Sequence, residues 1–281
     1  MKEIDCQYIS SGYKHQVFRC EDYAYKIVKE EFKEYDCREH FESEYLALNI
    51  LRTNGFCVPN ECEILSPNES FLKKWTLKES WMLGKQYLDG QMPKEYEKQV
   101  FNKLIEMANN ISGSYYGLFL PNTDVSCTWH AFLRTLHENY PLARIACPKL
   151  SITSNQINEL IESIVPINPR PVFIAMDTNL MNFFFDNNGT IVGIIDIEHQ
   201  IFGDFPFLLA NIRWRRDHSF HRDDWYSHWV ENCYYVDETL IDLYEFLIAF
   251  QEIHQRFRFG TSRNTIDNEF LILEKKMLQL I

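Results

Sequence analysis

The sequence lacks three features that would place it in common protein classes: a surplus of basic residues, paired cysteines and a long apolar run. Its 281 residues carry 28 Lys and Arg against 40 Asp and Glu, which gives a formal net charge of −12. A nucleic-acid binder needs a basic footprint, so this charge argues against a nucleic-acid partner. No run of about 18 apolar residues and no apolar N-terminal signal region is present, which predicts no membrane segment and no membrane partner.

The eight cysteines are scattered, and no C-x-x-C pair occurs. The nearest spacing is Cys57-x4-Cys62, and no matching Cys or His pair accompanies it, so a zinc site is not expected. Scattered cysteines without a signal region are typical of free thiols in a reducing compartment. The sequence therefore predicts a cytoplasmic protein.

The composition is that of a globular protein with a substantial core. Hydrophobic residues make up 46% of the chain and charged residues 24%, both ordinary for soluble proteins. Aromatic residues are abundant at 15% and are spread along the chain. Such side chains favour large packed interfaces over disorder.

The first ninety residues read as strands with one helix. Short apolar runs separated by turn signals predict strands at 7–9, 17–20 and 23–28. Apolar residues at 3–4 spacing predict a helix over about 35–52, which ends at Asn54-Gly55. Two further strands are expected at 61–65 and 80–87, and Asp89-Gly90 then breaks the chain.

Beyond Gly90 the pattern is mainly helical. Apolar stripes with a period of 3.6 predict helices at 96–111, 127–139, 155–164 (with Ser154 as its cap), 238–257 and 265–280. The exception is a hairpin, in which two apolar runs, 182–185 and 190–195, flank the turn residues Asp186 to Gly189. We expect a lobe of residues 1–89 and a larger lobe of residues 90–281.

Three polar residues frame the predicted hairpin. Asp177 and Asn182 precede it, and Asp196 follows its second strand, so the three side chains should converge at one end. Phosphoryl transfer needs a carboxylate to accept the proton of the attacking hydroxyl and hard oxygen ligands for Mg²⁺. The alternative is that Asp196 is a turn residue at the end of the hairpin.

The segment 171–210 resembles the catalytic segment of the aminoglycoside phosphotransferases and choline-kinase-like small-molecule kinases. That family shows H-G-D-x-x-x-x-N, a hairpin, I-D-x-E and then G-D-P before a helix. The matching residues here are Asp177, Asn182, Ile195 to Glu198, and Gly203-Asp204.

The resemblance implies a protein-kinase-like α+β fold with two lobes: a small antiparallel sheet with one helix, and a larger, mainly helical lobe. It implies transfer of the γ-phosphate of ATP or GTP to a hydroxyl of a small polar molecule, such as an aminoglycoside or another antibiotic. Asp177 would be the catalytic base, and Asn182 and Asp196 the Mg²⁺ ligands. Asp204 would support the loop, Glu198 would neighbour the substrate or metal, and the protein would be a monomer or weak dimer.

The N-terminal lobe offers matching nucleotide-binding residues. By resemblance Lys26, inside a short apolar strand, holds the phosphates, and Glu44 on the following helix is its partner, with Glu42 as a second candidate. The amides of Ser11 and Gly12 are candidates for phosphate contact, and the backbone from Gln86 to Leu88 for the nucleobase. Each feature also has a plain alternative: a lysine on a half-exposed strand, a helix-surface glutamate, or a simple turn.

Other functions remain open or are excluded by what is missing. Where the family has His-Gly before the catalytic Asp, this chain has Ala175-Met176, which keeps open a catalytically impaired, regulatory binding protein. No G-x-S-x-G elbow supports a serine hydrolase, and no D-F-G or A-P-E signature supports a protein kinase.

Overall fold

The chain divides into two compact units. The first comprises Met1–Asn110, Phe119–Asp124 and Ala175–Gln200, and the second comprises Ile111–Leu118, Val125–Ile174 and Ile201–Ile281. The computed structural model describes residues 6–11, 14–32, 37–87, 91–118, 128–138, 140–167, 170–177, 179–197, 199–217, 237–259 and 266–281. The hairpin that carries Asn182 and Asp196 thus shares a unit with Lys26 and Glu44. The lobe division at 89/90 stays a prediction.

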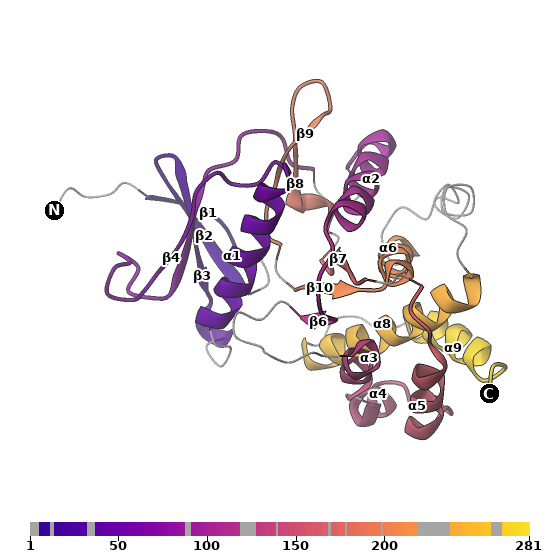
Figure 1. Ribbon diagram of the computed structural model, residues 1–281. Coiled ribbons are helices and arrows are strands. Elements are labelled where there is room, and N and C mark those ends of the chain that lie inside the picture. The colour runs from indigo at the N-terminus through magenta and orange to yellow at the C-terminus, as the bar shows by residue number, and fades with distance from the viewer. Residues whose placement is uncertain are drawn as a thin grey trace. The chain divides into compact units, whose positions relative to one another are not determined.

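The first unit is built on a five-stranded antiparallel sheet of order β1-β2-β3-β5-β4 (Figure 1). Its strands are β1 (Cys6–Ser11), β2 (His15–Cys20), β3 (Tyr23–Val28), β4 (Cys62–Leu65) and β5 (Thr76–Ser80). A tight turn joins β2 to β3, with Glu21 in the left-handed region at φ 55°. The predicted strand at 23–28 agrees with β3 residue for residue.

Helix α1 (Cys37–Thr53) lies along one face of this sheet (Figure 1). Its buried stripe includes Phe41, Leu48 and Leu51, the residues whose spacing predicts the helix. Gly55, two residues past the end of the helix, has φ 82°, a conformation that glycine adopts without strain. The short helix η1 (Glu30–Phe32) precedes α1.

The predicted strand at 80–87 is misplaced. The strand is β5, which pairs with β3 through Lys26↔Leu77 and Ala24↔Glu79. Thr76 and Glu79 are polar yet buried, so the strand lacks the alternating apolar pattern that would reveal it. Lys85 instead makes an isolated antiparallel bridge to Phe185.

The hairpin pairs β8 (Phe183–Phe185) with β9 (Ile191–Ile194) and follows the short helix η2 (Leu180–Asn182). Its turn is closed by Asp186, whose Oδ1 accepts hydrogen bonds from the backbone N–H groups of Asn188 and Thr190, both at 2.8 Å. Helix α2 (Lys94–Asn110) contacts the hairpin, and the Tyr96 ring stacks on Phe185 at 4.9 Å. The turn predicted at 186–189 is confirmed.

The second unit combines a small sheet with helices. The sheet has the order β6 (Gly117–Leu118), β10 (Gln200–Gly203), β7 (Val172–Ala175). The described helices are α3 (Trp129–His137), α4 (Tyr140–Ala146), α5 (Ser154–Ser163), α6 (Phe205–Asp217), α8 (Glu238–Phe259) and α9 (Ile266–Met277). Thr153, rather than the predicted Ser154, caps α5, because its hydroxyl accepts from the Gln156 N–H in a capping box. Across the described ranges, no helix has the length and apolar character needed to cross a membrane.

A buried hydrogen-bond chain lies in the core of this unit. Trp129 Nε1 donates to the Tyr244 hydroxyl at 2.8 Å, which donates to Asp204 Oδ2 at 2.9 Å. The other carboxylate oxygen of Asp204 accepts from the Ile167 N–H at 3.0 Å. Burial and the Asp204 charge raise the pKa of the Tyr244 hydroxyl above its ordinary value. Asp204 therefore ties the backbone at Ile167 to α8. Its support of the catalytic segment stays a prediction.

The prediction that all cysteines are free thiols is wrong for one pair. Cys6 and Cys20 stand opposite each other on β1 and β2, with Cα atoms 4.4 Å apart, and form a disulfide. Such directly opposed positions in a hairpin bring two cysteines within bonding range. Among the other described cysteines, Cys57, Cys62 and Cys147 form no disulfide.

Candidate functional site

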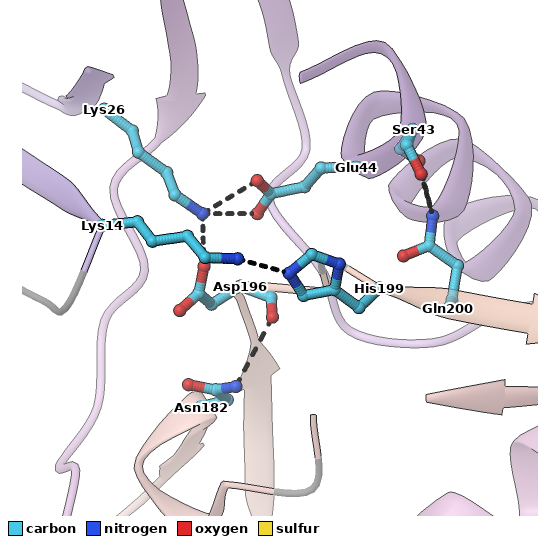
Figure 2. Close-up of polar contacts among 8 residues, drawn as sticks. All are labelled: Lys14, Lys26, Ser43, Glu44, Asn182, Asp196, His199 and Gln200. Carbon is cyan, nitrogen blue, oxygen red and sulfur yellow. Dashed lines mark hydrogen bonds and ion pairs between the residues drawn. The ribbon is translucent and has the colours of Figure 1, made fainter. Parts of the chain in front are cut away.

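Lys26 is the centre of a buried ion-pair network in the first unit. Its Nζ donates to Glu44 at 2.8 Å (Oε2) and 3.1 Å (Oε1), and also to Asp196 Oδ1 (Figure 2). Lys26 is 6% exposed and Glu44 0% exposed. A buried charge is tolerated where opposite charges and hydrogen bonds compensate for lost hydration, so these groups fix one another's positions.

Asp196 and Asn182 come together at the open end of the hairpin. Asp196 directly follows the hairpin, and its backbone is left-handed at φ 57°. The Ile195 N–H donates to the Asn182 carbonyl at 2.9 Å, and Asn182 Nδ2 lies 3.4 Å from the Asp196 carbonyl oxygen. Asn182 is buried, whereas the Asp196 side chain is 35% exposed. The convergence predicted for these two residues is therefore present.

Asp177 belongs to the first unit and stands two residues after the end of β7. The Met176 N–H donates to the His199 carbonyl at 3.3 Å, which ties the residue before Asp177 to the segment after Asp196. Asp177 Oδ1 accepts from the Asn179 N–H at 3.0 Å, and this contact orients the half-buried carboxylate. The start of the predicted catalytic loop is thus held next to the residues that follow the hairpin.

The donor set fits Mg²⁺. This ion takes hard oxygen ligands and is usually held by one or two carboxylates together with substrate phosphates and water. Asp196 offers a partly exposed carboxylate, and Asn182 an amide oxygen to which no described residue donates a hydrogen bond. In the described part of the chain, no three His, Cys, Asp or Glu side chains form a self-contained metal site. The residues suit a metal that arrives with a phosphate ligand.

The structure describes only some of the residues predicted to contact the nucleotide. Gln86 Nε2 donates to the Met181 carbonyl at 2.7 Å, so its side chain is engaged with the segment before the hairpin. Ser11 ends β1. Gly12, Leu88 and Glu198 lie outside the described residues.

Glu79 is a charged residue at this site that the sequence reading missed. It lies on the face of the sheet that carries Lys26, as the register of β5 against β3 requires, and it is 6% exposed. Burial raises the pKa of its carboxyl to about 7, and the Asp196 charge adds to the rise while Lys26 opposes it. The only sequence signal for it is an acidic residue inside a strand.

Replacement of Glu79 should change how stability depends on pH. A raised folded-state pKa means that ionisation costs the folded protein free energy, so stability falls as pH rises from about 4.5 through about 7. Glu79→Gln removes this cost, and its free energy of unfolding relative to the wild type should increase by roughly 2 kcal/mol between pH 5 and pH 8. Urea unfolding across this pH range measures it. Glu63→Gln, on β4 and exposed, is the control, and a Glu79→Gln difference independent of pH would contradict the assignment.

Gln200 is a second residue that the sequence reading missed. Its Nε2 donates to the Ser43 carbonyl at 2.7 Å and to the Ser43 hydroxyl at 2.9 Å, although Gln200 is fully buried (Figure 2). Ser43 precedes Glu44 on α1, so the contact fixes the helix turn that presents Glu44 to Lys26. No motif marks this residue, because the contact spans 157 positions of sequence.

Loss of the Gln200 amide should destabilise the first unit. Gln200→Leu leaves the part-buried Ser43 groups without this donor and should lower the free energy of unfolding by about 1–3 kcal/mol. Ser43→Ala, which removes only the hydroxyl acceptor, should cost about 1 kcal/mol or less. Chemical unfolding of both variants tests whether Gln200→Leu is the more destabilising. Equal stability of Gln200→Leu and the wild type would refute the stabilising role of Gln200.

These elements make up an α+β fold of the protein-kinase-like class, as the sequence predicts. The particular structures it resembles are small-molecule kinases. A thermostable mutant of aminoglycoside phosphotransferase APH(4)-Ia without ligand has a TM-score of 0.67 at 15% identity, over 97% of this chain and 92% of the other. A ternary complex of such a mutant with ADP and hygromycin B gives 0.65 at 16% identity, with the same coverage.

A further similar structure is choline kinase LicA from Streptococcus pneumoniae, with a TM-score of 0.55 at 12% identity, over 98% of this chain and 93% of the other. The resemblance stated from the sequence is therefore confirmed at the level of the fold. No protein-family model and no curated protein sequence matches the chain.

Proposed function

We propose that the protein is a magnesium-dependent kinase that transfers the γ-phosphate of ATP or GTP to a hydroxyl of a small polar molecule. The observation that carries the proposal is the network of Lys26, Glu44 and Asp196, with Asn182 beside it. It gathers a phosphate-binding ammonium and two metal-ligating oxygens, which phosphoryl transfer requires.

Each residue has a distinct task in this scheme. Asp177 would accept the proton of the attacking hydroxyl, and its hydrogen bond from Asn179 aims the carboxylate. Asn182 and Asp196 would hold Mg²⁺, which neutralises the phosphate charge that develops during transfer. Lys26 would bind the phosphates, steadied by Glu44.

The remaining nucleotide contacts are assigned to backbone groups. The Ser11 and Gly12 amides would contact phosphate, and the segment Gln86 to Leu88 would contact the nucleobase. Successive backbone N–H groups in a turn can point at one phosphate, so a glycine-poor connection can serve this purpose as well.

An amino-bearing alcohol is the substrate class that we favour. Similar folds occur in a structure that holds ADP and hygromycin B and in a choline kinase. The net charge of −12 would attract a cationic substrate. We place the enzyme in the cytoplasm as a monomer or weak dimer, with residues 1–89 as its nucleotide-binding lobe and 90–281 as its catalytic and substrate-binding lobe.

The second candidate is a catalytically impaired binding protein, which Ala175-Met176 in place of His-Gly favours. The Met176 backbone contact with His199 speaks for the enzyme, because it anchors the loop start without a histidine side chain. A regulatory protein would bind nucleotide without turnover.

A screen for phosphate transfer tests the proposed function. The full chain is incubated with Mg·ATP or Mg·GTP and a panel of aminoglycosides, amino alcohols and nucleosides, and mass spectrometry records the gain of one phosphate group. The Asp177→Asn variant is the matched control. We expect a compound in the panel to gain a phosphate group with the wild type and not with Asp177→Asn. Nucleotide binding without gain on any compound would favour the binding protein.

A further inference from the structure

A second lysine, Lys14, reaches the segment that carries Asp196. Lys14 precedes β2, and its carbonyl accepts a hydrogen bond from the Lys29 N–H at 2.9 Å. Its Nζ lies 2.8 Å from Nε2 of His199 (Figure 2). Lys26 binds Asp196, and Lys14 binds the residue three positions later. Two ammonium groups, one from β3 and one from the residue before β2, are therefore anchored on the ends of the segment 196–199.

The backbone of this segment is bent at both ends. Asp196 and His199 are left-handed, at φ 57° and 58°. Such a conformation costs a non-glycine residue about 1 kcal/mol or more and persists where the surroundings enforce it. The surroundings of His199 enforce it, because the His199 carbonyl accepts a hydrogen bond from the Met176 N–H and the His199 ring lies 5.5 Å from the His40 ring of α1. His199 thus presents its Nε2 from a fixed position.

The chemistry of the pair is compatible with anion binding. An ammonium group only donates hydrogen bonds, so His199 Nε2 acts as the acceptor in this contact. An anionic phosphate oxygen is a stronger acceptor than a neutral imidazole. Lys14 has three N–H donors, and it can keep its contact with His199 while another donor reaches a phosphate.

We propose that Lys14 binds the terminal phosphates of the nucleotide together with Lys26, and that His199 is the positioning residue that holds Lys14 for this purpose. The inference rests on the proposed function, since it assigns a further contact to the same nucleotide. It adds a phosphate contact from the end of the β1–β2 connection, where the sequence predicts only backbone amides. A triphosphate carries several negative charges, and one lysine with one Mg²⁺ leaves part of them without a partner.

Calorimetric titration of the full chain tests the role of Lys14. A non-hydrolysable triphosphate analogue and the nucleoside monophosphate are titrated in the presence of Mg²⁺ into the wild type, Lys14→Met, Lys14→Arg and Lys78→Met. Lys78 is the control, because it lies on the opposite face of β5 from Leu77 and Glu79 and pairs with Glu63 at 3.5 Å. We expect Lys14→Met to weaken triphosphate binding about 10- to 100-fold and monophosphate binding less than about 2-fold.

The outcomes separate this inference from the proposed function. Lys14→Arg should keep most of the triphosphate affinity, and Lys78→Met should equal the wild type. Unchanged triphosphate affinity in Lys14→Met, or an equal loss for triphosphate and monophosphate, would overturn the assignment while the proposed function stands. If the wild type binds no nucleotide at all, both this inference and the proposed function fail.

A double-mutant cycle tests the part assigned to His199. If the imidazole positions Lys14, then Lys14→Met should cost at least about 3-fold less triphosphate affinity in the His199→Ala background than in the wild type. Equal costs in the two backgrounds would show that His199 does not act through Lys14.

Discussion

Asp177→Asn should lower turnover by about 10²- to 10⁴-fold and leave nucleotide affinity nearly unchanged. The amide has the same shape and keeps an oxygen for the hydrogen bond from Asn179, so the loop should hold its geometry. What the amide loses is the ability to accept the proton of the attacking hydroxyl. A base acts in the transition state, and its loss therefore appears in turnover rather than in nucleotide binding.

Steady-state kinetics with the acceptor found in the phosphate-gain screen, together with nucleotide titration, measures both quantities. Glu106→Gln on the exposed surface of α2 is a control with the same change of chemistry. Near-normal turnover in Asp177→Asn would refute the role of base. A parallel loss of nucleotide affinity would indicate that Asp177 acts in binding instead.

Asp196→Ala should abolish magnesium-dependent activity, with a loss of at least about 10³-fold. The residue contributes the one carboxylate that we assign to the metal, and Asn182 alone is a neutral ligand. The substitution also removes a partner of Lys26, but Glu44 remains within 2.8 Å and keeps the ammonium paired. The fold should therefore persist while the metal is lost.

Activity measured over a series of magnesium concentrations tests this. Asp196→Ala should show no recovery at high magnesium, whereas Asn182→Ala should show partial recovery because the carboxylate remains. Circular dichroism checks that both variants are folded. Activity of Asp196→Ala near that of the wild type would contradict the assigned ligand.

The sequence predicts most of the elements that carry the site. The strand of Lys26, the helix of Glu44 and the hairpin before Asp196 all follow from local apolar periodicity and turn residues. The convergence of Asn182 and Asp196 follows from hairpin geometry, which is also local. These features can be read from a sequence because the residues that determine them are close neighbours.

The parts that were missed depend on distant contacts. Glu79 is buried beside Ala24 of the neighbouring strand, and Gln200 donates to Ser43, so no local sequence pattern marks either residue. The Cys6–Cys20 disulfide depends on strand register, which shifts at the irregularity between Tyr8 and Ser10. Lys14 and His199 are 185 positions apart, and only the folded chain brings them together.

The measurement that tests the central claim most directly is binding of a non-hydrolysable nucleoside triphosphate to the full chain, with and without Mg²⁺. The network of Lys26, Glu44 and Asp196 predicts saturable binding that Mg²⁺ strengthens in the wild type, and no strengthening by Mg²⁺ in Asp196→Ala. Absence of binding to the wild type at high nucleotide, or binding indifferent to Mg²⁺, would contradict the account.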